Sequence, residues 1–470
     1  MALAVRIDTF VHRSRIPASA ADVFDWHLRP GAFERLAPPW ERIRLVDAGG
    51  GVAEGSRAEI ELVLGPFRQH WTAEHRDIER GRQFRDVQVR GPFAHWEHTH
   101  TITPDGTDAC WLQDQIEFAP PFGAIGAWFG LPFIRRKLRA TFAYRHRTTA
   151  ADVLAHRHAA QAKHMKILVT GSTGLIGHSL VPFLTTGGHS VTRLVRRATP
   201  QHGGPNAAQE QTVRWDPVLG TIDHERLDGH DAVVHLAGEN IAAGRWTQRQ
   251  KKAIRESRLQ GTRLVCDALV NLRLPPKVLL CASAVGFYGD RGDEILDEKS
   301  LPGVGFLAEL CRDWEAATET VRPRGIRVVN LRFGIVLSPA GGALQKMLLP
   351  FKLGLGGPIG SGRQFWSWIE IDDAVGAIYH AVNCDHLSGP VNAVAPNPST
   401  NRDFTHTLGH VLRRPTVFPM PAFAARLALG EMANDLLLAS ARVVPRRLEE
   451  TGYAFRYPQL EPALRHVLGR

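Results

Sequence analysis

Long apolar runs are missing from this sequence of 470 residues: no stretch of eighteen or more uncharged apolar residues occurs, and we therefore predict no membrane span. The N-terminal segment MALAVRIDTFVHRSR lacks the apolar core of a secretory signal. The five cysteines are scattered, without CxxC or metal-type spacing, so we interpret them as free thiols in a reducing compartment. Together these absences predict a cytoplasmic protein.

A concentrated basic segment is also missing, although 57 Lys and Arg against 47 Asp and Glu give a formal net charge of +10. Proteins that bind nucleic acid usually gather their positive charge on one stripe or arm. Here the basic residues are spread along the chain between acidic ones, and only short clusters such as residues 135–137 stand out. We expect solvated basic faces and no nucleic-acid partner.

The chain is too long for a single ordinary core, so we expect more than one domain. A polar stretch rich in Ala and His occupies residues 156–164, and a new apolar run follows Met165. We predict a first domain over residues 1–155, a linker over 156–164, a second domain over 165–395 and a C-terminal part over 396–470.

The first domain shows short alternating segments separated by turn residues. Strands are predicted at residues 56–64 and 111–118, and a long helix over 125–156 that Pro132 interrupts. The segments RSRIPASAADVFDW and GPFAHWEHTHTI resemble the START-like superfamily of polyketide-cyclase and lipid-transfer proteins. This resemblance implies an α+β helix-grip fold, a sheet curved around one helix, with a hydrophobic ligand between them.

Three histidines near the end of this domain raise the question of a metal site. His98 and His100 share one face of a predicted strand, and His95 lies just before them. No acidic or thiol residue stands at a recognisable ligand spacing, and the neighbouring Trp96 and Ile102 indicate packing. We interpret the three as ordinary sheet histidines and predict no metal.

The second domain opens with a buried apolar strand, residues 166–170, which leads into GSTGLIG and then into a helix. Gly171 permits a tight turn, Gly174 lets the backbone approach a pyrophosphate, and Gly177 lets the helix pack closely on the strand. The helix N-terminus offers N–H groups and a positive dipole end to the phosphates. Pro182 should bend or shorten that helix. The order of strand, glycine turn and helix predicts dinucleotide binding.

The second strand of this unit, residues 190–195, ends at the pair Arg196 and Arg197. An NAD enzyme commonly places an acidic residue there for the ribose 2′-hydroxyl, whereas an arginine suits the 2′-phosphate of NADP. The sequence therefore favours NADP(H); a solvated loop arginine is the alternative.

Further buried strands are predicted around residues 231–238, 277–283 and 327–332, with helical stretches between them such as 248–269. This alternation predicts an α/β doubly wound Rossmann fold with a parallel sheet. The motifs VTGSTGLIG, HLAGEN, SAVGFYGDRGDE and LGLGGPIGSGRQFWSWIEIDD resemble nucleoside-diphosphate-sugar epimerase-like proteins, an atypical extended family of short-chain dehydrogenases. The resemblance spans residues 165–470 and includes that family's C-terminal DUF1731-type segment, a small substrate-side part.

The turn residues and the resemblance together give one set of candidate NADP(H)-binding positions. They are Gly171, Ser172, Thr173, Gly174, Leu175, Ile176, Gly177, Val195, Arg196, Leu236, Ala237, Gly238 and Arg258.

The usual catalytic pair of short-chain dehydrogenases, Tyr-x-x-x-Lys, is absent. Its places fall at Leu307, which has no proton to give, and at Cys311, which carries no positive charge. Ser283 occupies the strand-end position that steadies a substrate oxygen, and Tyr288 is the nearest candidate acid. A tyrosine that merely packs its turn is the alternative for Tyr288.

Two functions stay open at this point, besides a third in which the N-terminal domain is a cyclase or hydratase that merely shares a chain with the reductase-like unit. One is an NADP(H)-dependent, epimerase-like oxidoreductase that acts on a small molecule, either a sugar nucleotide or a hydrophobic carbonyl compound. The other is a non-catalytic NADP(H)-binding sensor or scaffold whose N-terminal domain holds a lipid or polyketide-like ligand.

Overall fold

A curved antiparallel sheet forms the N-terminal domain. The computed structural model describes residues 7–47, 51–65, 67–121, 123–158, 164–196 and 210–470. Seven strands pair in the order β1-β7-β6-β5-β4-β3-β2. They are β1 (Asp8–Ile16), β2 (Ile43–Asp47), β3 (Arg57–Leu64), β4 (Phe67–Glu79), β5 (Gln83–Arg90), β6 (His95–Pro104) and β7 (Cys110–Ala119).

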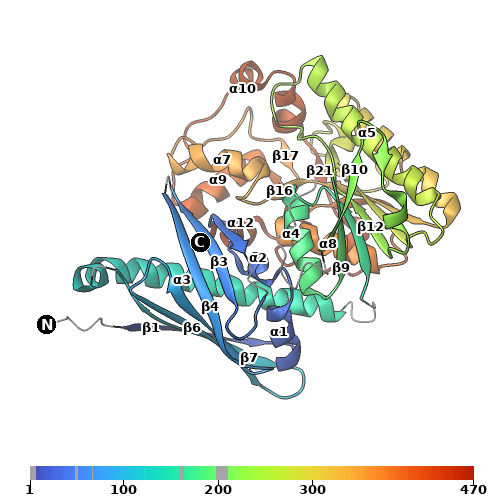
Figure 1. Ribbon diagram of the computed structural model, residues 1–470. Helices are drawn as coiled ribbons and strands as arrows, with labels where there is room; N and C mark the ends of the chain where they lie inside the picture. The colour runs from blue at the N-terminus through green and yellow to red at the C-terminus, as the bar shows by residue number, and fades with distance from the viewer. Residues whose placement is uncertain (1–6, 48–50, 66, 122, 159–163, 197–209) are drawn as a thin grey trace.

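One long helix lies across this sheet. Helix α3 (Gly123–His158) runs along the sheet face in Figure 1, and the short helices α1 (Ala20–Leu28) and α2 (Ala32–Leu36) follow β1. The predicted helix-grip arrangement is confirmed. The predicted interruption was wrong, because α3 passes through Pro132 without ending. Proline removes one backbone donor, and the contacts of a 36-residue helix outweigh that single loss.

The second domain is built on a parallel sheet with the order β10-β9-β8-β12-β13-β15-β19, to which β11 adds an antiparallel edge. Its strands are β8 (Lys166–Thr170), β9 (Ser190–Val195), β10 (Glu210–Asp216), β11 (Thr221–Ile222), β12 (Ala232–His235), β13 (Val278–Ala284), β15 (Arg327–Phe333) and β19 (Gly389–Ala393). The chain moves outward from β8 in both directions, as a doubly wound fold requires.

Helices cover both faces of this sheet. Helices α4 (Leu175–Thr186) and α8 (Ile371–Asn383) share one apolar core with the sheet, and α5 (Gln248–Val270) contributes to the other. Helix α6 (Phe306–Ala316) also contacts β13. The predicted doubly wound Rossmann fold is therefore confirmed.

The C-terminal part completes a third core beside the sheet. Helices α9 (Asn401–Leu412) and α12 (Leu460–Leu468) pack with α7 (Gly342–Lys352) and the short strands β17 (Phe365–Trp366) and β18 (Trp368–Glu370). This core draws residues from both sides of position 395. The sequence placed the boundary between the second domain and the C-terminal part at this position. In the structure, the segments before and after it pack into one core.

Proline 182 does not end α4, contrary to the expected shortening, because the helix continues to Thr186. Its backbone lies against the N-terminal domain at Gly31, which has a φ of +90°. A Cβ atom at Gly31 would stand 2.7 Å from the Cα atom of Pro182. Gly31 is the N-cap of α2. The two domains are in such close contact there that a side chain would not fit.

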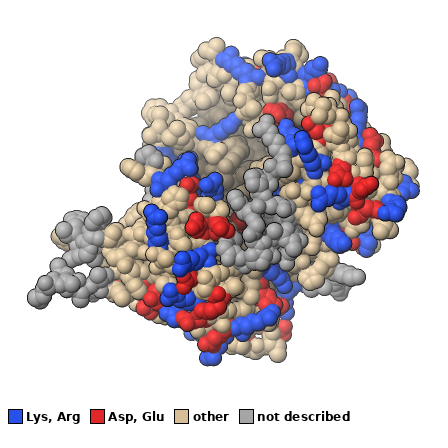
Figure 2. All heavy atoms as spheres, viewed as in Figure 1, with Lys and Arg blue, Asp and Glu red and all other residues tan. Residues whose placement is uncertain are grey.

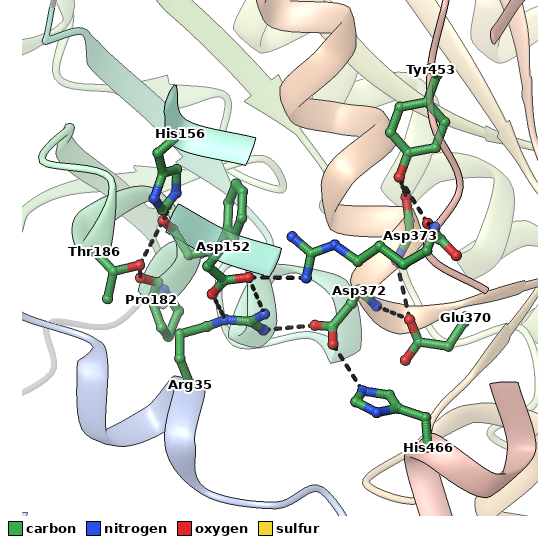
Figure 3. Close-up of polar contacts among 12 residues, drawn as sticks. Arg35, Asp152, His156, Pro182, Thr186, Glu370, Asp372, Asp373, Tyr453 and His466 are labelled. Carbon is green, nitrogen blue, oxygen red and sulfur yellow. Dashed lines mark hydrogen bonds and ion pairs between the residues drawn. The ribbon is translucent and has the colours of Figure 1, made fainter. Parts of the chain in front are cut away.

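A buried arginine joins the two domains. The guanidinium of Arg35 on α2 donates to both oxygens of Asp152 on α3, at 2.6 and 2.9 Å, and to Asp372 Oδ1 on α8 at 2.8 Å (Figure 3). Arg456 also donates to Asp152, at 3.0 Å. The side chains of Arg35, Asp152 and Asp372 are each no more than 5% exposed. Every charge in this group therefore depends on the others for its partner.

The neighbouring carboxyl groups of Glu370, Asp372 and Asp373 at the start of α8 have different surroundings, and their pKa values shift in different directions. Burial alone would raise the pKa of Asp372, but Arg35 outweighs it and holds that pKa well below its ordinary value. Burial and the two neighbouring aspartates raise the pKa of Glu370, whose side chain caps α8 by accepting from two backbone N–H groups. His466 approaches the second oxygen of Asp372 at 3.2 Å. In this cluster Glu370 caps α8, and Asp372 forms the interdomain ion pair with Arg35 and contacts His466.

The surface carries both signs of charge. In Figure 2, Lys and Arg side chains alternate with Asp and Glu over both domains of the face shown. This distribution favours solvated basic faces over a nucleic-acid stripe. Among the helices that the structure describes, none is long and apolar enough to cross a membrane.

We expect Arg35→Met to destabilise the protein strongly, because it leaves the buried carboxylate of Asp372 without its cation and leaves Asp152 with Arg456 alone. Breaking a buried ion pair from one side costs about 3–5 kcal/mol. Urea unfolding measured by circular dichroism checks the loss. The matched control is Arg15→Met, which removes an ion pair with Asp105 whose side chains are 56% and 42% exposed, and should cost less than about 1 kcal/mol. Equal unfolding midpoints for the two variants would contradict this role of Arg35.

Candidate cofactor site and the position for catalysis

The glycine turn stands between β8 and α4. Gly171 has a φ of +66°, and a Cβ atom there would lie 2.7 Å from the carbonyl of Leu236. At Gly177 a Cβ atom would lie 2.7 Å from the Cα atom of Ser172 and overlap the Gly171 carbonyl. Only glycine fits the backbone at either position. The glycine turn therefore lies in close contact with the backbone of Leu236, directly after β12.

The start of α4 is open to a ligand. Its N-cap is Gly174, which has no side chain to cap the first N–H groups, and no side chain among the described residues caps them. Thr173 and Gly174 are exposed, Leu175 and Ile176 half-buried, and Ser172 is buried. Uncapped N–H groups at a helix N-terminus suit an anion such as a pyrophosphate. The structure therefore places the predicted turn residues where a dinucleotide's phosphates would bind.

The end of β12 is fixed to the end of β8 by one hydroxyl. Thr170 Oγ1 accepts from the backbone N–H groups of Leu236 and Ala237, at 3.1 and 3.2 Å. His235 contacts the same hydroxyl at 2.8 Å, and burial lowers the pKa of this histidine to about 4. Sequence reasoning missed Thr170 and His235, because a buried strand end gave no sign of a polar contact across strands.

Arg193 on β9 lies beside the glycine turn. Val195 is half-buried and Arg196 is exposed, directly after the strand, while Arg197 lies outside the residues that the structure describes. Arg193, two residues earlier on the same strand face as Val195, donates from Nε to Ser172 Oγ at 3.2 Å. Sequence reasoning missed Arg193. Residues two apart on a strand share a face, so the predicted position of Val195 could have indicated Arg193 as well.

Arg258 reaches the turn after β12 from α5. Its guanidinium donates to the carbonyl of Glu239 at 3.1 Å and stacks over the Trp314 ring at 5.0 Å. A Cβ atom at Gly238 would lie 3.3 Å from Arg258 Cζ. The predicted residues on β8, β12 and α5 are thus brought together at the carboxyl edge of the sheet, the edge at which doubly wound folds bind ligands.

Ser283 lies at the same edge, on β13, and its hydroxyl is committed to a carboxylate. Ser283 Oγ donates to Glu315 Oε1 at 2.7 Å. Arg332 holds Glu315 through two bonds, at 2.8 and 2.7 Å. A bidentate guanidinium fixes a carboxylate in place. Ser283 therefore has a defined orientation, with Glu315 as the acceptor of its proton, and sequence reasoning had not assigned Glu315 or Arg332.

The two positions of the missing catalytic pair are both apolar in character. Leu307 packs against the turn after β13, since a Cβ atom at Gly286 would lie 3.1 Å from Leu307 Cβ. The Cys311 thiol contacts Ser283 and the backbone of Ala284. Burial raises the pKa of Cys311 to about 11, so the thiol is neutral. Leu307 therefore has no proton to give, and the neutral Cys311 thiol cannot supply the positive charge of the usual lysine.

Tyr288 is fully buried in a short 3-10 turn, η3 (Val285–Tyr288). Its hydroxyl donates to Asn392 Oδ1 or the Asp297 carbonyl, at 2.8 and 3.0 Å, and accepts from Arg332 at 2.9 Å. Burial raises its pKa to about 12 in spite of Arg332. This geometry favours the packing alternative for Tyr288, and its role as a catalytic acid stays a prediction.

Comparison with known proteins divides the chain in the same way. Residues 16–142 match the family described as polyketide cyclase / dehydrase and lipid transport, residues 167–392 the NAD dependent epimerase/dehydratase family, and residues 420–467 a domain of unknown function, DUF1731. The chain is 41% identical over 304 residues to the epimerase family protein Mb2239 of Mycobacterium bovis, which covers 65% of this chain and 98% of that protein.

Two solved structures extend the comparison. A structure described as the nucleoside-diphosphate sugar epimerase from Corynebacterium glutamicum covers 98% of this chain and 90% of its own, with 33% identity and a TM-score of 0.79. The human epimerase family protein SDR39U1, solved with NADPH, covers 65% of this chain and 99% of its own, with 36% identity and a TM-score of 0.58. A similar protein of Arabidopsis thaliana is described as chloroplastic, so the cytoplasmic location stays a prediction.

The match to Mb2239 over nearly its whole length, together with the glycine turn at the carboxyl edge of a doubly wound sheet, identifies the chain as a member of the epimerase family.

Proposed function

We propose that the chain is an NADP(H)-dependent oxidoreductase with an epimerase-like site, acting on a small sugar-nucleotide or hydrophobic carbonyl substrate. The main support for the proposal is the N-terminus of α4, where no side chain of the N-cap residue caps the helix and where Gly171 and Gly177 allow a tight glycine turn. The arginine that follows β9 favours the phosphorylated cofactor. The human relative solved with NADPH supports the same choice.

Each part of the site has one task in this proposal. The turn holds the pyrophosphate, Arg196 pairs with the 2′-phosphate, and Arg258 borders the ribose side of the cleft. When bound, NADP(H) supplies or accepts a hydride. Ser283 steadies a substrate hydroxyl by accepting a hydrogen bond from it while its own proton is donated to Glu315, and it steadies a substrate carbonyl by turning that proton from Glu315 to the carbonyl oxygen.

A second candidate function is NADP(H) binding without turnover. It is supported by Leu307 and Cys311 in place of the usual pair and by the buried hydroxyl of Tyr288. The N-terminal domain would then bind a hydrophobic ligand, as its match to polyketide cyclases and lipid-transport proteins suggests. Cofactor turnover separates the two functions.

Arg196→Glu should weaken NADPH binding at least tenfold and leave NADH binding within about threefold, because only NADPH carries the 2′-phosphate that a charge-assisted bond would hold. Isothermal titration with both cofactors measures the two dissociation constants. Arg273→Glu is the matched control, since it makes the same charge change on a side chain that is 93% exposed, after α5. Equal losses for NADPH and NADH would remove the argument for a 2′-phosphate site.

Gly177→Ala should weaken NADPH binding at least tenfold while the chain still folds, because the new methyl group displaces the Gly171 carbonyl and distorts the turn. Fluorescence titration with NADPH checks the affinity, and thermal unfolding without cofactor checks the fold. Gly244→Ala is the control, since a Cβ atom there meets nothing within 4 Å. Unchanged NADPH affinity in the Gly177 variant would place the dinucleotide elsewhere.

Ser283→Ala should lower kcat by about 100-fold and leave the NADPH dissociation constant unchanged, because the serine orients the reacting oxygen and does not hold the cofactor. The absorbance of NADPH, followed with a panel of carbonyl compounds and sugar nucleotides, measures turnover. If no substrate in the panel oxidises NADPH bound to the unsubstituted chain, the sensor function replaces the oxidoreductase.

A further inference from the structure

A polar layer crosses the otherwise apolar interior of the N-terminal domain. On one face of β7 the residues Cys110, Leu112, Asp114, Ile116 and Phe118 are all buried, so a carboxylate interrupts an apolar strand face. The apolar residues on its two sides belong to separate core clusters. The side chains that make up the layer are His12, His75, Asp86, His98, His100, Asp114 and His146.

Strand register assembles this layer. His98 on β6 pairs with Asp86 on β5, and Asp86 pairs with His75 on β4. His100 pairs with Asp114 on β7. Residues directly opposite on one face of an antiparallel sheet have neighbouring side chains. Carboxylates therefore stand next to the histidines although no spacing along the sequence shows it, and the interpretation of these histidines as ordinary sheet residues had lacked this observation.

Three of these side chains direct one donor atom each toward a common point. Asp86 Oδ2 lies 3.8 Å from His98 Nδ1 and 3.4 Å from His100 Nε2. All three donor atoms lie within 4.8 Å of one another. Ligand atoms at about 2.0–2.2 Å from a tetrahedral zinc ion are about 3.3–3.6 Å apart. The two separations between Asp86 Oδ2 and the histidine nitrogens are close to that arrangement.

The other ring nitrogens of both histidines face a second carboxylate. Asp114 Oδ1 lies 2.8 Å from His98 Nε2 and 2.7 Å from His100 Nδ1. His75 contacts the remaining oxygen of Asp86, and His146 that of Asp114. In metal sites a carboxylate commonly holds the far nitrogen of a ligating histidine and so fixes its tautomer and orientation. The layer thus has an inner set of three donors and an outer carboxylate, Asp114, which hydrogen-bonds to His98 and lies beside His100.

We propose that Asp86, His98 and His100 bind one divalent transition-metal ion, of the zinc or ferrous class, inside the N-terminal domain. Two imidazoles and one carboxylate leave coordination positions open for water or an oxygen atom of a ligand. The Asp86 side chain is 22% exposed, which gives the ion a route from solvent. Asp114 is a positioning residue that acts through the two histidines. The proposal does not depend on the cofactor site, because it concerns the other domain.

The test uses the full chain without an affinity tag, stripped of metal by a chelator and then titrated with Zn²⁺ or with Co²⁺ as a spectroscopic probe. We expect one equivalent per chain, measured by elemental analysis after dialysis, and a Co²⁺ absorption spectrum of low coordination number. Binding of less than a tenth of an equivalent by the unsubstituted chain would show an ion-pair layer without a metal and would overturn the proposal.

Variants locate the ion. His98→Gln should abolish stoichiometric binding, and Asp114→Asn should weaken it by about 10–100-fold, as removal of an outer carboxylate does. His95→Gln is the matched control on the same strand, since His95 is 30% exposed and lies outside the donor set; it should bind like the unsubstituted chain. Unaltered binding by His98→Gln would place the ion elsewhere and overturn the proposal. Thermal unfolding and NADPH affinity, measured on each metal-free variant, check that both domains remain folded.

Discussion

The contact that fixes the two domains to each other is the buried guanidinium of Arg35 between two carboxylates. Asp152 belongs to the helix that the first sheet holds, and Asp372 begins a helix that covers the second sheet. Because ions lose their hydration on burial, these charges are tolerable only when all of them are paired. Asp152 and Asp372 can therefore be buried only when the two domains are docked so that Arg35 reaches both carboxylates. Figure 3 shows Arg35 between these two partners.

Within the second domain, the geometry of parallel strands decides where chemistry is available. Strands β8, β12 and β13 end at one edge, so the glycine turn, the Leu236 turn and Ser283 meet there. The backbone supplies most of the cofactor site, through N–H groups and the absence of Cβ atoms. At the position for catalysis, Ser283 and its Glu315–Arg332 pair stand near Leu307 and Cys311, which distinguishes this site from one with a tyrosine and a lysine.

The first domain uses the same principle of converging side chains on an antiparallel sheet. Its inward faces are apolar at both ends and polar in the middle, where imidazoles and carboxylates alternate across neighbouring strands. Buried polar groups are stable when they have partners. Strand register brings carboxylate partners to His75, His98 and His100. The two domains thus carry separate polar sites, one on a sheet edge and one in a sheet interior.

The sequence alone predicted the dinucleotide turn, because strand, turn and helix lie within about twenty consecutive residues and each glycine has a local backbone reason. It also predicted both fold types and the loss of the tyrosine and lysine. It missed Glu315, Arg332, Thr170 and Arg193, and it left the histidines without carboxylate partners. Only tertiary structure decides such contacts: Arg35 and Asp372 are 337 residues apart, and His98 reaches Asp114 only through strand register. Side-chain partners across strands and domains follow from packing, and no local pattern of residues encodes them.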